Sequence, residues 1–179
     1  MSTVDESIVP DDKDWTWVLQ EPCAECGFRA EDVDPRGVAD LVRACLPRWQ
    51  QVLARPDAAA RRRADVWSDL EYACHVRDVL VLFAERLRLM LTADEGEARF
   101  ANWDQDATAV EQRYAEQDPA VVARELTAAG EHLAEAFDAV PSDAWGRVGL
   151  RSDGSVFTVE TFAQYFWHDV AHHLVDVDG

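Results

Sequence analysis

Apolar residues recur at intervals of three and four along most of this 179-residue chain, a spacing typical of one face of an α-helix. The first such stripe follows Asp34 and Pro35, which suit a helix start because aspartate can cap the first turn and proline fits its first position. The stripe consists of Val38, Leu41, Val42, Cys45, Leu46, Trp49 and Leu53. It predicts a first helix that Pro47 kinks or breaks.

Two longer stripes predict the next helices. One runs over residues 58–91 with Asp57 as its cap, and at about 1.5 Å per residue it would be roughly 50 Å long. After a loop, a helical run opens at Asp106, breaks near Pro119 and continues as a third long helix to about residue 140.

A fourth stripe predicts the last helix, which Thr158 caps. Only residues 147–150 and 155–159 could form strands, so no strand pattern competes with the helices. Four principal helices with mostly short connections favour an all-α fold. We therefore predict an antiparallel or crossover four-helix bundle over residues 34–179.

Residues 1–33 are predicted to be an irregular extension of this bundle. After an acidic start, the segment DWTWVLQEPCAECGF carries Trp15, Trp17 and Phe28 between proline and glycine residues. These aromatic rings have too much apolar surface to remain in water. We therefore expect the extension to pack on the outside of the bundle.

The amino-acid composition and net charge indicate a single folded domain and disfavour some kinds of partner. A hydrophobic content of 48% with seven tryptophans predicts one folded domain with a sizeable core. The formal charge of -18 disfavours nucleic acid and anionic membranes as partners. No stretch approaches the roughly 20 apolar residues of a membrane span, and the acidic start lacks a signal-peptide pattern. We expect a cytoplasmic protein with a small-molecule substrate, and the tryptophans leave material for a homodimer interface.

Two histidines in the last helix are the main candidate for chemistry. His168 and His172 are four residues apart, so their side chains lie on one helical face and can share a metal ion. His75 is embedded in another apolar helical pattern and is the candidate third ligand. Three imidazoles leave a tetrahedral position for water or substrate. The sequence therefore predicts a metal site with an open position.

Other interpretations of these histidines stay open. Asp169 and His173 form a competing pair if the helix is rotated, and we rank this pair lower because Asp169 suits the role of an outer-shell acceptor. His75 could instead be a hydrogen-bonded histidine at the edge of the core. His132 lies among surface-type residues and is expected to be exposed.

Cys23 and Cys26 form a C-x-x-C pair in the extension. This spacing occurs in redox pairs and as half of a zinc knuckle, and two inert thiols are the third interpretation. Pro22 and Gly27 indicate a turn here, whereas a redox pair would follow a strand and open a helix. Cys45 and Cys74 lie within predicted helices, where burial as small apolar residues is expected.

The chain from about Asp34 to Val177 resembles the DinB-like superfamily, which includes mycothiol-dependent maleylpyruvate isomerases and related thiol S-transferases. The matching residues are His75 and the H-x-x-x-H of HDVAHHL. The resemblance implies that His75, His168 and His172 hold a divalent metal in a four-helix bundle, usually zinc and sometimes nickel or another transition ion. Some isomerase-like members have a glutamate at the position of His168, so the all-histidine set looks closer to the metal-dependent S-transferase branch.

The resemblance also implies a reaction. A low-molecular-weight thiol would bind the metal as thiolate and attack a small electrophile, and a metal-bound water is the other nucleophile that such a site can use. Tyr165, Trp103 and Asp104 are the residues expected to line the pocket, and no general base can be assigned. The alternatives are a non-catalytic metal-binding bundle, structural or sensing, and a redox protein that works through Cys23 and Cys26.

Overall fold

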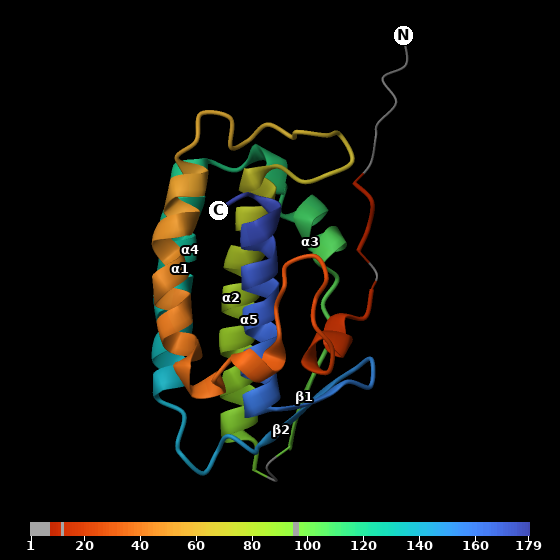
Figure 1. Ribbon diagram of the computed structural model, residues 1–179, viewed down its shortest axis with the longest axis vertical. Coiled ribbons are helices and arrows are strands. Elements are labelled where there is room, and N and C mark those ends of the chain that lie inside the picture. The colour runs from red at the N-terminus through yellow and green to blue at the C-terminus, as the bar shows by residue number, and fades with distance from the viewer. Residues whose placement is uncertain (1–7, 12, 95–96) are drawn as a thin grey trace.

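The computed structural model describes residues 8–11, 13–94 and 97–179, and four long helices form its body (Figure 1). The predicted all-α bundle is confirmed, with a small sheet added to it. The long helices are α1 (Val38–Leu53), α2 (Asp69–Thr92), α4 (Pro119–Asp138) and α5 (Val159–Asp176). The short elements are α3 (Gln105–Glu111), β1 (Glu97–Phe100), β2 (Val148–Arg151), β3 (Val156–Thr158) and the 3-10 turns Trp15–Leu19, Ala30–Asp32, Pro35–Gly37 and Tyr114–Glu116.

The bundle has a crossover connection, because two helices that are consecutive in the chain are not neighbours around the bundle. α1 and α5 run in one direction and α2 and α4 run in the other (Figure 1). α4 packs against α1 and α2, and α5 contacts the same two helices. Helices α1 and α2, which are consecutive in the chain, therefore lie diagonally opposite, and the segment between them crosses one end of the bundle (Figure 1).

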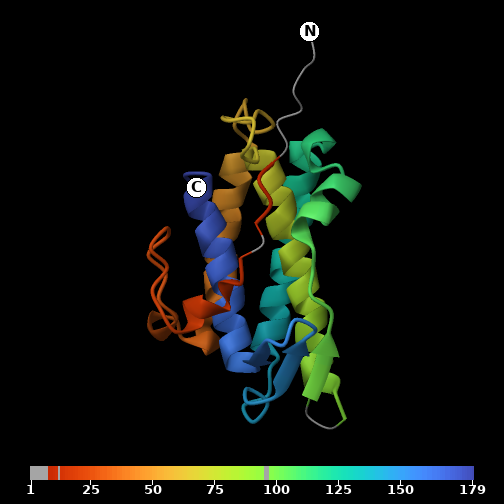
Figure 2. The ribbon, with the colours of Figure 1, turned by 90° about the vertical axis from the view of Figure 1, so that its right-hand side faces the viewer.

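The small sheet lies at the other end, where α2 ends and α5 begins (Figures 1 and 2). β2 pairs with β1 in parallel and with β3 in antiparallel orientation. β3 falls within one of the two segments that could extend and β2 overlaps the other, ending one residue later at Arg151, whereas β1 was not predicted. The parallel partner of β1 is about fifty residues away in the chain, so no local pattern indicates the pairing.

The predicted start of the second helix at residue 58 is wrong. α2 begins at Asp69, and residues 54–68 form the crossover loop. Ser68 and Glu71 form a capping box, in which each side chain accepts a hydrogen bond from the backbone N–H of the other residue. This reciprocal cap satisfies two N–H groups that the helix leaves free, and it determines where the helix starts.

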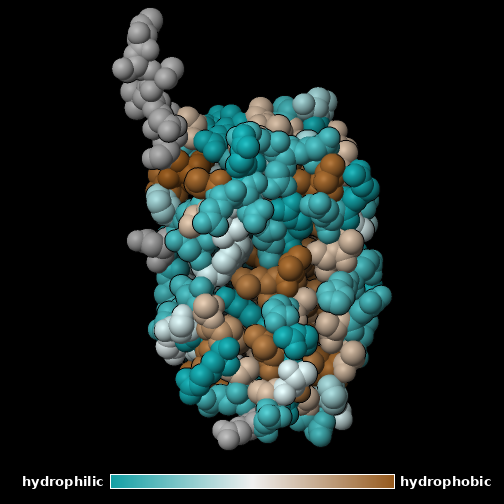
Figure 3. All heavy atoms as spheres, turned by 180° about the vertical axis from the view of Figure 1, so that it is seen from behind, coloured by the Kyte–Doolittle hydropathy of each residue, from teal (hydrophilic) through white to brown (hydrophobic). Residues whose placement is uncertain are grey.

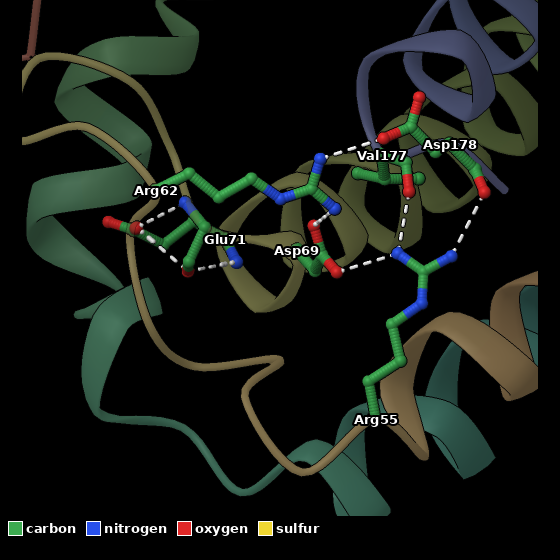
Figure 4. A network of polar contacts seen from close by, with 7 residues as sticks. Arg55, Arg62, Asp69, Glu71, Val177 and Asp178 are labelled. Atoms are coloured by element: carbon green, nitrogen blue, oxygen red, sulfur yellow. Dashed lines mark hydrogen bonds and ion pairs between the residues drawn. The ribbon is translucent and has the colours of Figure 1, made fainter.

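Arginines of the crossover loop connect the start of α2 to the end of α5 (Figure 4). Arg55 donates hydrogen bonds to the Asp69 carboxylate at 2.8 Å and to the backbone oxygen of Val177 at 2.6 Å. Arg62 binds the carboxylate of Asp178 at 2.8 Å. These contacts hold the start of α2 against the end of α5. His75 lies on α2, and His168, His172 and His173 lie on α5.

The N-terminal extension packs along α5 (Figure 2). Its buried residues Val18, Cys23, Phe28 and Ala30 form a second small apolar cluster. The side chain of Gln164 on α5 donates to the backbone oxygen of Ala30 at 2.9 Å. Residues 1–7 and 12 of the predicted extension lie outside the described residues.

The described surface carries aliphatic side chains as well as charges. On the face shown in Figure 3, hydrophobic residues form several patches between hydrophilic ones. Val9, Val81, Val110 and Val156 are among the exposed aliphatic residues. A homodimer stays a prediction. None of the described helices has the length and apolar composition needed to cross a membrane.

We expect Ser68→Ala to lower the free energy of unfolding by about 1 kcal/mol, because it removes the side-chain acceptor of the α2 cap. Denaturant titration followed by circular dichroism measures this change. Ser142→Ala is the control, since Ser142 is exposed in a turn and its side chain has no hydrogen bond to the described residues. Equal stability of Ser68→Ala and the parent protein would contradict the importance of this cap.

Candidate metal centre

Helix α5 presents two pairs of potential ligands on neighbouring faces. His168 and His172 face the N-terminal extension, where they lie with Cys23 and Cys26. Asp169 and His173 are each one position further along the helix, which rotates them by about 100° toward α2. They lie there with His75.

The group of His75, Asp169 and His173 has distances that suit a metal ion. One oxygen of Asp169, Oδ1, lies 3.3 Å from Nε2 of His75 and 3.7 Å from Nε2 of His173. Metal–ligand bonds of about 2.0–2.2 Å in a tetrahedral arrangement require ligand atoms roughly 3.3–3.5 Å apart. Only small adjustments of the side chains would therefore bring all three atoms onto one ion.

Several polar atoms of this group have no hydrogen bond. Both ring nitrogens of His75 and Oδ1 of Asp169 are buried and find no hydrogen-bond partner among the described residues. Leaving buried polar atoms unpaired costs about 1–3 kcal/mol each. A cation bound between them would offset this cost, so the residues present fit a divalent metal.

A second carboxylate orients one of the ligands. Asp176 Oδ2 lies 2.8 Å from Nδ1 of His173. A hydrogen bond at Nδ1 directs the lone pair of Nε2 toward Asp169 and His75, and metal-binding histidines commonly have such a partner. Asp176 therefore has the position of an outer-shell residue.

The electrostatics of the group favour the ligand forms of His75 and Asp169. Burial lowers the pKa of His75, so its ring is neutral and can offer a lone pair. Burial would raise the pKa of Asp169, but the neighbouring imidazoles outweigh it and hold that pKa at about 2. The result is one carboxylate facing a neutral imidazole, which is a suitable donor set for a borderline metal. At His173 burial lowers the pKa, but the hydrogen bond to Asp176 and the charge of Asp169 outweigh it and raise that pKa, so a metal would displace a proton there.

The three histidines predicted from the sequence do not converge. His75 lies with the competing pair, Asp169 and His173, while His168 and His172 lie beneath the extension. On a helical wheel, Asp169 and His173 are within roughly 20° of Phe162, closer to the apolar face than His168 and His172. That signal was present in the sequence. The candidate donor set around His75 is thus two histidines and a carboxylate rather than three histidines.

A cavity of about 660 Å³ opens beside this group. Asp169 lines it, and so do the three residues proposed from the sequence, Tyr165, Trp103 and Asp104. The indole of Trp103 also stacks on His75, with ring centroids 5.4 Å apart. The metal candidate therefore borders a space large enough for a small molecule.

Two buried arginines in this cavity were missed by the sequence analysis. Arg151 is paired with Asp153 at 2.8 Å and donates to the hydroxyl of Tyr165 at 3.2 Å. Arg86 is 5% exposed and has no ion pair with a carboxylate of the described residues. Burial and the charge of Arg151 lower the pKa of Arg86 to about 10. An arginine inside the apolar stripe of a predicted helix is the signal that could have indicated this site.

Comparison with known proteins bears on the fold. No family model matches the sequence, and no curated protein matches it. YfiT from Bacillus subtilis, described as a probable metal-dependent hydrolase with an unusual four-helix bundle topology, matches with a TM-score of 0.65 and 18% identity over 87% of this chain and 86% of that chain. The chain therefore shares the four-helix bundle fold of YfiT.

A second solved structure, the mycothiol-dependent maleylpyruvate isomerase, has the same bundle. It matches with a TM-score of 0.62 and 13% identity over 83% of this chain, which spans 61% of the isomerase. At these identities the likeness establishes the fold alone. The ligands and the pocket must be argued from the residues of this chain.

We expect His75→Ala, Asp169→Ala and His173→Ala each to lower the zinc content of the purified protein by one ion per chain, because each removes one of three converging ligands. Asp176→Asn should keep the ion and weaken its binding about 10- to 100-fold. Elemental analysis and zinc titration measure both effects. His132→Ala, on the exposed face of α4, is the control and should bind like the parent. Undiminished zinc in Asp169→Ala would refute this ligand set.

Proposed function

We propose that this chain is a metal-dependent enzyme that activates a low-molecular-weight thiol for attack on a small anionic electrophile. The observation that carries the proposal is the convergence of His75, Asp169 and His173, of which Asp169 lines a cavity. The same cavity contains Arg86, which has no ion pair with a carboxylate of the described residues. A reactive ion and a binding site for negative charge would then share one space.

The first part of the proposal concerns the ion. His75, Asp169 and His173 would hold a divalent metal, most plausibly zinc, with nickel or another transition ion as the other option. Such an ion lowers the pKa of a thiol or a water at its open position and so supplies a nucleophile at neutral pH. Asp176 keeps the ring of His173 in the orientation that binding requires.

Arg86 supports an anionic substrate. Its guanidinium donates to the backbone oxygen of Ala101 at 2.7 Å, while its Nε is buried without a partner among the described residues. A buried charge without a counterion is unfavourable, and a carboxylate or similar group of a substrate would neutralise it. The rings of Phe83 and Phe100 lie within 5.7 Å and 4.8 Å of the guanidinium and limit its movement.

The volume of the cavity is large enough for two small molecules. Its volume of about 660 Å³ is in the range that accommodates a drug-sized ligand, so a small thiol and a small electrophile fit together. Trp103 and Phe83 provide apolar walls, and Tyr165 with Arg151 provides hydrogen-bond donors. These groups can orient a substrate beside the ion.

The thiol as cosubstrate rests on the resemblance to mycothiol-dependent enzymes. Hydrolysis by a metal-bound water is a second candidate, since YfiT is described as a probable metal-dependent hydrolase. A non-catalytic metal-binding bundle remains the alternative from another class, and the unpaired Arg86 in an open cavity argues against it.

We expect the zinc-loaded protein to consume carboxylate-bearing electrophiles, such as activated alkenes and epoxides, only when a small thiol is supplied. Mass spectrometry of the products with mycothiol, bacillithiol and cysteine measures this dependence. Treatment with a chelator should abolish turnover, and added Zn²⁺ should restore it. Turnover of ester or amide substrates without thiol would replace the transferase by a hydrolase.

We expect Arg86→Gln to raise KM for an anionic substrate about 10- to 100-fold, since a hydrogen bond to a charged group contributes about 1.5–3 kcal/mol. Steady-state kinetics with an anionic substrate and its neutral amide analogue measure the effect, and the amide should be affected less. Arg88→Gln is the matched control, because Arg88 is exposed two positions along α2 and pairs with Glu85. An equal loss for both substrates would exclude Arg86 as the anion-binding residue.

A further inference from the structure

A second group of metal-ligand residues lies where the extension meets α5. Cys23 and Cys26 come from the extension, and His168 and His172 come from α5. One ligand atom from each of the four residues lies within 4.8 Å of the others. We infer that these residues bind a structural zinc ion that fastens the extension to the helix carrying the catalytic ligands.

The distances suit a tetrahedral site. Sγ of Cys23 lies 3.7 Å from Nδ1 of His172. With Zn–S bonds of about 2.3 Å and Zn–N bonds of about 2.0–2.1 Å, a tetrahedral ion places sulfur and nitrogen roughly 3.6 Å apart. Cys23 and His172 therefore already have nearly the separation that coordination requires, and the ligand atoms of Cys26 and His168 lie within 4.8 Å of them.

The backbone of the C-x-x-C segment has the form of a metal-binding turn. The N–H of Gly27 donates to the backbone oxygen of Cys23 at 2.8 Å, and the N–H of Cys23 donates to Phe28 at 2.9 Å. Gly27 has a φ of 77°, a left-handed conformation that glycine adopts without strain. This tight turn brings the two sulfur atoms to the same side.

Both histidines have the features of ligands. Nε2 of His168 is buried without a hydrogen-bond partner among the described residues, and His168 is only 3% exposed. Nε2 of His172 lies 3.5 Å from the carboxylate of Glu25, which leaves Nδ1 directed at the cysteine. A carboxylate at the outer nitrogen is the usual arrangement for a zinc-bound histidine.

The surroundings indicate a closed site. The ring of Trp15 lies 5.5 Å from His168 and 5.1 Å from His172, and the ring of Phe28 lies 5.0 Å from His168. Cys23 is 1% exposed. Four protein ligands inside an apolar shell leave no position for substrate, which is the pattern of a structural rather than a catalytic zinc.

The proposed structural zinc site is connected to the proposed catalytic site through the N-terminal extension. The extension that it would fasten also supplies Asp14 and Trp15 to the wall of the large cavity. Trp15 further lines a small cavity of about 40 Å³ that lies between the two ligand groups. Zinc at the cysteines would therefore stabilise one wall of the pocket in which the proposed reaction takes place.

A redox role for the two cysteines agrees less well with the structure. Both thiols are free, and a reactive cysteine needs exposure and a low pKa. Cys23 is buried, and Cys26 is only partly exposed. Bound zinc would instead hold both as thiolates, as cysteine ligands of zinc always are.

Cobalt substitution tests the inference on the unaltered full-length chain. Co²⁺ bound to two thiolates gives intense sulfur-to-cobalt charge-transfer bands, which histidine and carboxylate ligands do not produce. We expect these bands in the parent protein and in His75→Ala, and their loss in Cys26→Ser. Elemental analysis of the zinc form should give two ions per chain for the parent and one for Cys26→Ser.

The controls separate this site from the proposed catalytic one. Cys45→Ser replaces a buried cysteine on α1 outside both groups, so it should keep both ions and the charge-transfer bands. Loss of zinc in Cys26→Ser but not in His75→Ala supports the structural site while refuting the catalytic one. Absence of the bands in the parent protein, or a Cys23–Cys26 disulfide that persists with zinc present, overturns the inference.

Limited proteolysis provides a readout of the structural role. If zinc fastens the extension, chelation should increase the rate of cleavage within residues 13–33 at least tenfold, and Zn²⁺ should reverse the change. Cys26→Ser should be cleaved rapidly with and without Zn²⁺. Cleavage of the parent at the same rate with and without Zn²⁺ would show that the ion does not hold this segment.

Discussion

The candidate metal centre depends on one buried carboxylate oxygen that lies between two imidazole rings. This oxygen must stay close to both rings, so it limits how α2 and α5 can be placed relative to each other. Oδ1 of Asp169 lies 3.3 Å from His75 and 3.7 Å from His173, and it has no hydrogen bond among the described residues. A buried charge without full pairing is unfavourable unless something else compensates it. The arginine contacts at the ends of α2 and α5 hold the two helices in register, so the three side chains remain together (Figure 4).

Helix α5 connects the two ligand groups because neighbouring positions on a helix point in different directions. His168 and His172 face the extension, and Asp169 and His173 face α2. A rotation of about 100° per residue separates the two faces while keeping them on the same turns. An extension that is fixed to one face of α5 also fixes part of the cavity wall, because both the extension and Asp169 on the other face of α5 line that cavity.

Among the described residues of its lining, the large cavity has two buried arginines together with six aspartates and one lysine. The protein has a formal charge of -18, yet Arg86 and Arg151 both line the large cavity and are nearly buried. Arg151 is neutralised by Asp153, whereas Arg86 has aromatic neighbours and a backbone carbonyl. The proposed binding of an anion therefore depends on direct contact with Arg86, because short-range interactions in a partly desolvated site are screened less than the charges of the surface.

The sequence by itself determined the bundle, because the apolar spacing that marks each helix is a local property. It placed the end of α1 at Leu53 and the cap of α5 at Thr158 correctly. Asp34 caps a 3-10 turn, however, and α1 begins at Val38 and is not broken at Pro47. The start of α2 was misplaced because the Ser68 capping box was overlooked in a run of good helix formers. The sequence also identified every residue type that could bind a metal. It did not determine how those residues are grouped: His75 meets Asp169 and His173, and the cysteines meet His168 and His172, only because of how α5 is rotated against α2 and where the extension lies. Both depend on contacts between segments far apart in the chain, which leave no periodic signal, and so only the tertiary structure decided which ligands belong to the same site.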